Sequence, residues 1–323
     1  MRLCSFEESR NSLRQGVYYW LHALLLALAP GVLCLAQSRP SDNTPLSLSS
    51  PTDLSITKEV TEVNLTLSVI DRKGHFVPNL TPDDLTIQDN GQPPQKVTYF
   101  EQQSQLPLRI AILIDESDSV KHVLEEQKRA AMTFLKHVFR PADLALIIGF
   151  TQHAQMSQSP TDDLHLLTHA LKSLRGGGET AIYDAIVSAV DALKQIKDQF
   201  PCRRLVILLT DGQDNASAAD LKSAIETAQR NEISVYVVIV GYPEQDSRTA
   251  MGQLADLTGG MSSSANDPTV IDVAFSKLDG NLRSQYAIGY KPLNAAADGS
   301  FHLITVQVSK KLRARYRHGY FAK

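Results

Sequence analysis

The central part of the chain alternates short apolar runs with longer segments that carry apolar residues at helical spacing. Apolar runs without polar alternation are typical of strands buried on both faces of a parallel sheet. We expect such strands at Leu108–Ile114, Leu144–Phe150, Leu205–Asp211 and Val235–Val240, with a polar edge strand near Ala154–Ser159. We expect helices at Val120–Phe139, Asp162–Leu174, Thr180–Gln195, Ala218–Arg230, Thr249–Thr258 and Thr269–Leu282. This order predicts a doubly wound α/β fold with a mostly parallel sheet over residues 106–283.

The segments on either side of this centre show strict apolar and polar alternation, as in strands with one buried face. It runs through Val63–Val69 near one end and through Tyr286–Tyr290 and Ile304–Val308 near the other. The triplet Asp89-Asn-Gly91 predicts a hairpin turn, so residues 58–103 are expected to form a small antiparallel unit. Such a unit is marginal alone. We therefore predict that it pairs with residues 284–323 into one β-sandwich, with the α/β domain inserted between them.

The N-terminus has the pattern of a secretory signal. Three arginines precede the apolar run Val17–Ala36, which ends in small residues. We predict a signal peptide over 1–36 with cleavage after Ala36, and an uncleaved membrane anchor as the alternative, since the run is about long enough to span a bilayer. Residues 37–57, rich in Ser, Pro and Thr, are expected to form a flexible linker. Both alternatives predict export to the periplasm, cell envelope or medium.

Charge and cysteine content exclude several classes of protein. The 32 basic residues nearly balance the 35 acidic ones, so the electrostatic footprint of a nucleic-acid binder is absent. The basic residues from Lys310 to Arg317 are interpreted as the solvent-facing side of the last strand, with a phosphate or polyanion site as the lesser alternative. Outside the signal segment Cys202 stands alone, which excludes an internal disulfide framework and a thiolate metal site. We expect it to be a packed side chain rather than a nucleophile.

Oxygen-bearing side chains follow the first predicted buried strand. Asp115, Ser117 and Ser119 would lie at the carboxyl edge of the sheet, where ligands of α/β proteins bind. They suit a hard cation such as Mg²⁺ or Mn²⁺, or alternatively an N-cap with solvated acids. Thr180 follows a run of three glycines, and Asp211 ends another buried strand, so both are expected at the same edge. Together the five residues favour the cation site. The nearby acids are interpreted as solvated surface residues: Glu116, Asp118, Glu179 and Asp214.

This set of residues resembles the metal-ion-dependent adhesion site (MIDAS) of the von Willebrand factor A (VWFA) domain. The family pattern is Asp-x-Ser-x-Ser, then Thr, then Asp, and Asp115, Ser117, Ser119, Thr180 and Asp211 match it without substitution. The resemblance covers about 106–283 and implies the Rossmann-like VWFA fold. It also implies that the hydroxyls bind Mg²⁺ or Mn²⁺ directly, while the two aspartates act through water or hydrogen bonds. An Asp or Glu of a protein partner would complete the metal shell.

The flanking segments resemble those of exported bacterial VWFA-related proteins of the acidobacterial type. In that family the A domain lies between an N-terminal β segment with Asp-x-x-Gly and a C-terminal Gly-Tyr ending. Asp71-Arg-Lys-Gly74 and His318-Gly-Tyr320 fit this layout. The resemblance implies an exported adhesion-type binding protein rather than an enzyme, with a last helix, Thr269–Leu282, that moves in some related domains.

Two alternatives differ in class from this interpretation. Asp115 after a buried strand is similar to the nucleophile of haloacid-dehalogenase-like phosphatases, so a magnesium-dependent phosphohydrolase is possible on that residue alone. Those enzymes need a second carboxylate two residues later, where this chain has Ser117. Motifs of P-loop, α/β-hydrolase and zincin enzymes do not occur in the chain. The second alternative is a structural envelope module without a metal-dependent ligand.

Overall fold

A computed structural model describes residues 62–102, 106–265, 268–309 and 311–323. The predicted signal peptide, 1–36, and the predicted linker, 37–57, lie outside the described residues. The division into segments at 58–103, 106–283 and 284–323 stays a prediction. Within the described ranges, no helix is long and apolar enough to cross a membrane.

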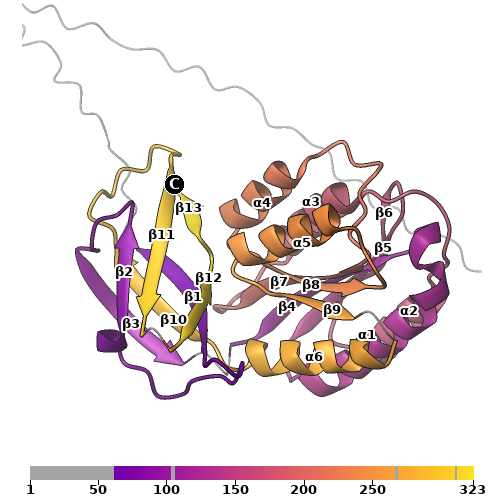
Figure 1. Cartoon of the computed structure of the whole chain (residues 1–323), viewed down its shortest axis with the longest axis horizontal. Coiled ribbons are helices and arrows are strands. Elements are labelled where there is room, and N and C mark those ends of the chain that lie inside the picture. Colours follow the sequence, from indigo (N-terminus) through magenta and orange to yellow (C-terminus); the bar gives the residue numbers. More distant parts are fainter. Residues whose placement is uncertain (1–61, 103–105, 266–267, 310) are drawn as a thin grey trace, which may run out of the picture. The chain divides into compact units, whose positions relative to one another are not determined.

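The centre of the chain forms the predicted doubly wound α/β layer structure (Figure 1). Its six strands run in the order β6-β5-β4-β7-β8-β9, and all neighbours pair in parallel except the edge strand β6. The strands are β4 (Leu108–Asp115), β5 (Leu144–Phe150), β6 (Ala154–Thr161), β7 (Arg203–Thr210), β8 (Ser234–Val240) and β9 (Ser262–Ala265). The sequence prediction of the fold class is thus confirmed.

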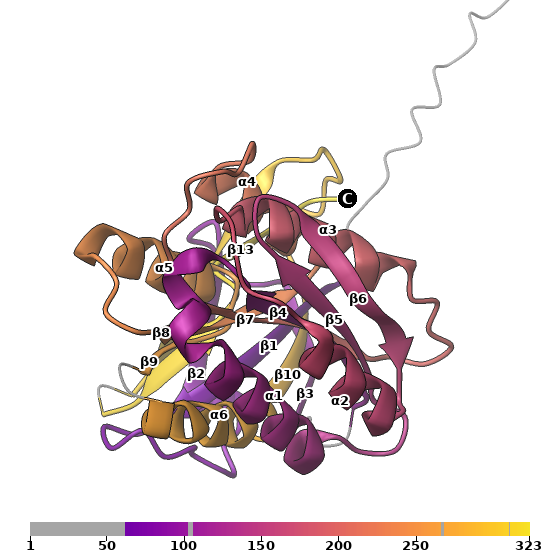
Figure 2. The ribbon, with the colours of Figure 1, turned by 90° about the vertical axis from the view of Figure 1, so that its right-hand side faces the viewer.

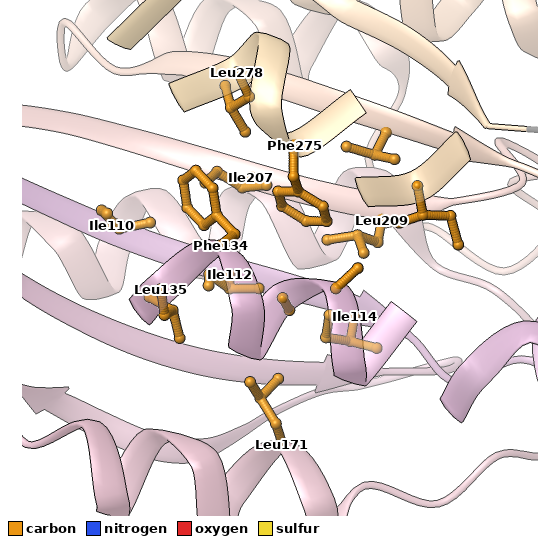
Figure 3. Close-up of a cluster of buried hydrophobic side chains, with 14 of the residues drawn as sticks. Ile110, Ile112, Ile114, Phe134, Leu135, Leu171, Ile207, Leu209, Phe275 and Leu278 are labelled. Atoms are coloured by element: carbon orange, nitrogen blue, oxygen red, sulfur yellow. The ribbon is translucent and has the colours of Figure 1, made fainter. Parts of the chain in front are cut away.

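Helices cover both faces of this sheet (Figure 2). One face carries α1 (Leu124–Val138), α2 (Leu164–Ser173) and α6 (Pro268–Leu282), and the other carries α3 (Ile182–Gln195), α4 (Leu221–Arg230) and α5 (Gln245–Leu257). Side chains of β4 alternate between the two cores because strand residues point to opposite faces in turn. In the α1/α6 core, Phe134 and Phe275 lie with ring centroids 5.0 Å apart (Figure 3). The continuous apolar runs follow from this double burial.

Helix starts are where prediction and structure differ most in the central domain. The helix predicted from Val120 begins as a 3₁₀ turn, η2 (Asp118–Val123), before α1 starts at Leu124. Predicted starts at Asp162 and Ala218 are early because aspartates cap the helices: Asp163 accepts from the His165 N–H at 2.7 Å, and Asp220 from the Ser223 N–H at 2.7 Å.

The two flanking segments pair into a β-sandwich, as predicted. One sheet has the strand order β12-β1-β10-β3 and the other β13-β11-β2. The strands are β1 (Val63–Ile70), β2 (Leu85–Asp89), β3 (Lys96–Gln102), β10 (Tyr286–Lys291), β11 (Phe301–Val308), β12 (Arg313–Tyr316) and β13 (Gly319–Phe321), with a short 3₁₀ turn η1 (Pro82–Asp84) before β2. Inward residues of both segments share one apolar core. Each segment thus supplies strands and apolar side chains that complete the sheets and the core of the other.

The predicted hairpin at Asp89-Asn-Gly91 is wrong. The tight turn exists, with φ of 48° at Asn90 and 76° at Gly91 and a bridge from Asp89 to Gln92. The chain then crosses to the other sheet, since β2 pairs with β11 and β3 with β10. Pro93 and Pro94 explain the crossing, because they lack the N–H groups that a continuing ladder needs. Residues 58–103 therefore do not form an antiparallel unit of their own, because their described strands pair with C-terminal ones.

A buried polar network joins the two segments inside the sandwich. Asp89 Oδ2 accepts from the Tyr290 and Tyr320 hydroxyls, each at 2.9 Å, and Asp89 Oδ1 lies 2.7 Å from His302 Nδ1. Gly319 must lack a side chain, since a Cβ there would come within 2.6 Å of the His302 carbonyl oxygen. These contacts give the Gly319-Tyr320 ending a structural role. Through Asp89, they bond the C-terminal segment to the end of β2 in the N-terminal segment.

The interpretation of the basic run Lys310–Arg317 as a solvent-facing strand side is wrong at Arg317. Arg313 is exposed and Arg315 is half-buried, but only 6% of Arg317 is exposed. Its guanidinium donates to the Asn64 carbonyl oxygen at 3.2 Å and lies 3.7 Å from the Glu232 carboxylate of the α/β domain. A bridge from Arg317 to Thr258 continues this contact. The side of the strand was predicted correctly, but the α/β domain covers that side.

Candidate functional site

The five predicted site residues lie on three loops at the carboxyl edge of the parallel sheet. Asp115 ends β4, and Asp211 directly follows β7, the neighbouring strand, whose Leu209 pairs in register with Ile114. Thr180 precedes α3 in the loop that follows α2. Parallel strand ends meet at one edge of a sheet, so the topology brings the three loops together.

Asp115 lies buried at the bottom of the site. Its Oδ1 accepts from the Ser117 N–H at 2.9 Å, and its Oδ2 accepts from the Thr210 hydroxyl at 2.6 Å. Burial, and to a smaller extent the charge of Asp211, raise the pKa of Asp115 to about 6 although these hydrogen bonds act in the opposite direction. Ion pairs among the described residues involve neither Asp115 nor Asp211. Within the part of the chain that the structure describes, neither carboxylate is therefore paired with a cationic side chain.

Ser117 and Ser119 present a pair of hydroxyl oxygens next to Asp115. The two Oγ atoms lie 3.1 Å apart. Ser117 is buried, whereas Ser119 is exposed, so the pair reaches from the base of the site to the surface. Ser117 is the N-cap of the following 3₁₀ turn but accepts no capping hydrogen bond, and Ser119 lies inside that turn. The alternative in which these serines serve as helix caps thus finds no support in the hydrogen bonds.

Backbone hydrogen bonds bring the loop of Thr180 against the other two. The Thr180 N–H donates to Asn215 Oδ1 at 2.8 Å, and its carbonyl oxygen accepts from the Asn215 and Ala216 N–H groups, each at 3.0 Å. On the other side, Gly177 donates to the Glu116 carbonyl oxygen at 2.6 Å. Gly177 and Gly178 have φ of 140° and 121°, which favour glycine. The glycine run therefore lets the Thr180 loop lie against the loop of the two serines.

Several residues that support the site were missed by sequence reasoning. Thr210 holds Asp115 through its hydroxyl, which also accepts from the Gly212 N–H at 3.0 Å. Asp214 was expected to be solvated, but its Oδ1 accepts from the Ile182 N–H at 2.7 Å and so caps α3. Glu116, also expected at the surface, is half-buried and accepts from the Arg175 N–H. The sequence signal for Thr210 was its place directly before Asp211, the acid at the end of the predicted strand.

The chemistry of these donors fits a hard divalent cation. Three hydroxyls and two carboxylates are oxygen ligands of the kind Mg²⁺ takes, and the carboxylates lack a protein counter-charge. In the described part of the chain, no group of three or more His, Cys, Asp or Glu side chains could hold a metal. If a metal binds at the candidate site, Ser117, Ser119 and Thr180 are the direct ligands available, with Asp115 and Asp211 beside them.

Cys202 lies away from this edge, at the start of β7, and is held as an inert thiol. Its Sγ donates to Asp198 Oδ2 at 3.0 Å, and burial together with this bond raises the pKa of Cys202 to about 11. Because the thiolate is the reactive form, iodoacetamide near pH 8 should alkylate Cys202 about 100-fold more slowly than an unperturbed thiol. Peptide mapping would measure this rate. Urea-unfolded protein should react at the ordinary rate, and fast alkylation of the folded chain would contradict the prediction.

The fold and the site define a class of α/β domains that carry a cluster of oxygen ligands at the carboxyl edge of the sheet. Residues 110–213 match the family profile of the von Willebrand factor type A domain. The central domain of this chain is therefore a von Willebrand factor A domain. Such domains typically mediate protein–protein interactions. A search of curated proteins gave no match.

Solved structures similar to this chain include bacterial proteins. A von Willebrand factor type A protein from Catenulispora acidiphila is 12% identical, with a TM-score of 0.49; the match covers 83% of this chain and 74% of that one. An aerotolerance-related membrane protein from Bacteroides fragilis is 18% identical, with a TM-score of 0.45, covering 54% and 98%. The pilus adhesin SpaC from Lactobacillus rhamnosus GG is 10% identical, with a TM-score of 0.47, covering 76% and 48%.

Proposed function

We propose that this chain is a metal-dependent protein-binding module. Mg²⁺ or Mn²⁺ binds at Asp115, Ser117, Ser119, Thr180 and Asp211 and, in turn, binds a carboxylate of a partner protein. The single observation that carries this proposal is the buried Asp115 carboxylate. It lies beside a second acid and a pair of hydroxyls, and the ion pairs of the described residues do not include it. A bound divalent cation would neutralise this buried charge.

The partner is expected to present an Asp or Glu side chain. A site built mainly from neutral hydroxyls leaves the charge of a divalent cation only partly neutralised, so the metal favours a further anionic ligand. Ser119 is exposed, so the site is open to a protein surface. The partner carboxylate is therefore a ligand of the metal and also the group that confers specificity.

The phosphohydrolase alternative gains no support from the geometry. The two oxygens of Asp115 accept hydrogen bonds from the Ser117 N–H and the Thr210 hydroxyl, and these contacts include no second carboxylate that could serve as a general acid. Ser117 occupies the position of the missing second carboxylate. Hydrolysis of generic phosphoesters by the parent protein, lost in Asp115→Asn, would support this alternative.

Removing one exposed hydroxyl tests the metal site with little effect on folding. Ser119→Ala should weaken Mg²⁺ binding at least about tenfold, because one direct ligand is lost. Calorimetric titration and the metal-induced rise in melting temperature would measure the change. Ser188→Ala, an equally small change at an exposed serine of α3, is the matched control and should bind like the parent. The proposal would be contradicted if millimolar Mg²⁺ and Mn²⁺ left the melting temperature of the parent protein unchanged.

Export forms a separate part of this proposal. It rests on the basic residues and the apolar run of segment 1–36, which are typical of a secretory signal and would direct the binding domain to the periplasm, the envelope or the medium. Fractionation of cells that express the full chain would test it. Recovery of the protein in the cytosol would contradict export but would not bear on the proposed metal site.

A further inference from the structure

A cavity of about 1010 Å³ lies between the sandwich and the α/β domain. The outer face of the four-stranded sheet contributes Asn64 and Thr66, while the beginnings of β7 and β8 contribute Arg204 and Ser234. The strand β7 has eight residues, so its two ends lie roughly 25 Å apart at about 3.3 Å per residue. This cavity is therefore separate from the loops that carry the predicted metal ligands. Its volume is at the upper end of the range of small-molecule sites.

The walls of this cavity are basic although the whole chain is weakly acidic. The chain has a net charge of −3. Six basic side chains line the cavity: Lys194, Arg203, Arg204, Arg230, Arg317 and Lys323. Three acidic side chains are found among the described residues of the lining: Glu62, Glu101 and Glu232. Positive charge is thus concentrated in a concave site, where it attracts anions most effectively.

Neighbouring carboxylates neutralise these arginines incompletely. Arg204 shares one carboxylate, Asp198, with Arg109, at 2.5 and 2.6 Å. Arg203 donates to the Leu282 carbonyl oxygen at 2.7 Å and is absent from the ion pairs of the described residues. Two arginines therefore depend on a single acid, and a third is bonded to neutral oxygen. The structural bonds hold the guanidinium groups in place and leave positive charge in excess.

Arg230 is positioned in the same way without being neutralised. Its guanidinium carbon lies 3.4 Å from the centroid of the Phe321 ring, which is a cation–π contact. Lys194 pairs with Asp191 at 3.3 Å, but both side chains are largely exposed, so this pair is weak. Neutral hydrogen-bonding groups of Asn64, Thr66 and Ser234 stand beside these cations.

We propose that this cavity binds a small organic polyanion. Phosphate or carboxylate groups of the ligand would be held by Arg204, Arg230 and Lys194, with the neutral side chains fixing its orientation. Fixed guanidinium groups favour such planar or tetrahedral oxyanions because they offer paired N–H donors. The concave volume, which is open to solvent on one side, is of the size that takes a small molecule, and the acidic chain as a whole disfavours a polynucleotide. Arg317, from the basic run Lys310–Arg317, is one of the residues that line this cavity.

Calorimetric titration and thermal melting of the full chain test this proposal. Pyrophosphate and citrate serve as probes, with potassium chloride at matched ionic strength as the reference. The experiment is done in EDTA, so the predicted metal site cannot contribute. We expect at least one probe to raise the melting temperature by about 3 °C at a tenfold excess over its Kd. A response to pyrophosphate alone would assign a phosphorylated ligand, and a response to citrate alone a polycarboxylate.

Paired charge variants decide whether the cavity is the site. The double variant Lys194→Gln/Arg230→Gln changes two exposed side chains and should weaken binding at least tenfold. Lys172→Gln/Lys222→Gln removes the same charge from exposed positions outside the cavity lining and should bind like the parent. Ser119→Ala should also bind like the parent, so the outcome is independent of the metal site.

Three results would overturn the proposal. The first is a melting shift no larger than that given by chloride at the same ionic strength. The second is equal loss of binding in both double variants, which would indicate attraction by net charge. The third is an oligonucleotide that binds more tightly than either small probe, which would identify an open polyanion surface instead of a cavity site.

Discussion

Asp115→Asn is expected to abolish the response of the protein to Mg²⁺ and Mn²⁺ without destabilising the metal-free protein. With metal at about 100 times its Kd, the parent should gain about 2.7 kcal/mol in the free energy of unfolding, and the variant should gain nothing. The loss follows because asparagine keeps the size of the side chain but removes the negative charge at the base of the site. Thermal melting with EDTA and with metal would measure both states.

The metal-free arm of this experiment separates a metal site from a structural hydrogen-bond network. Burial raises the pKa of Asp115 to about 6, so near neutral pH its ionised form costs folding free energy. Asparagine can still accept from the Ser117 N–H and can donate to the Thr210 hydroxyl oxygen. The variant should therefore melt in EDTA at or above the temperature of the parent. A variant that melts well below the parent in EDTA would show that Asp115 is mainly structural.

Local patterns were sufficient to predict that the candidate residues lie at one edge of the sheet, but not which residues hold them there. Asp115 and Asp211 end apolar runs that are visible in the sequence, and the parallel order of those runs places both at one edge. Thr210 could not be recognised in the same way, because its role depends on a hydroxyl that reaches across to the neighbouring strand. Glu116 and Asp214 looked like surface charges, since their partners are backbone N–H groups about 59 and 32 residues away.

Long-range contacts also explain the two errors in the sandwich. A turn such as Asp89-Asn-Gly91 specifies the local backbone, but the pairing of the strands beyond it depends on partners near the other end of the chain. Alternation in the last strands likewise specifies which side Arg317 points to, but not what covers that side. In both places the prediction was correct for the local conformation. The missing information lay in segments at least 50 residues distant.

Phe134→Ala should lower the free energy of unfolding of the described domain by about 3–5 kcal/mol. Phe134 is 2% exposed and packs on Phe275 of α6, so its removal leaves a cavity between α1, α6 and the sheet (Figure 3). Urea denaturation followed by circular dichroism would measure the loss. Phe200→Ala is the matched control, since Phe200 is 74% exposed and should change stability by less than about 0.5 kcal/mol.

The same variant shows whether the core and the metal site are energetically independent. Phe134 lies in the third turn of α1, whereas the predicted metal ligands lie at the carboxyl edge of the sheet, and Phe134 is not itself one of them. Free energies of distant sites add. Saturating Mg²⁺ should therefore stabilise Phe134→Ala by the same amount as the parent, and Phe134→Ala/Ser119→Ala should lose both contributions. A metal response that falls along with core stability would show instead that packing of α1 and α6 controls the geometry of the ligand loops.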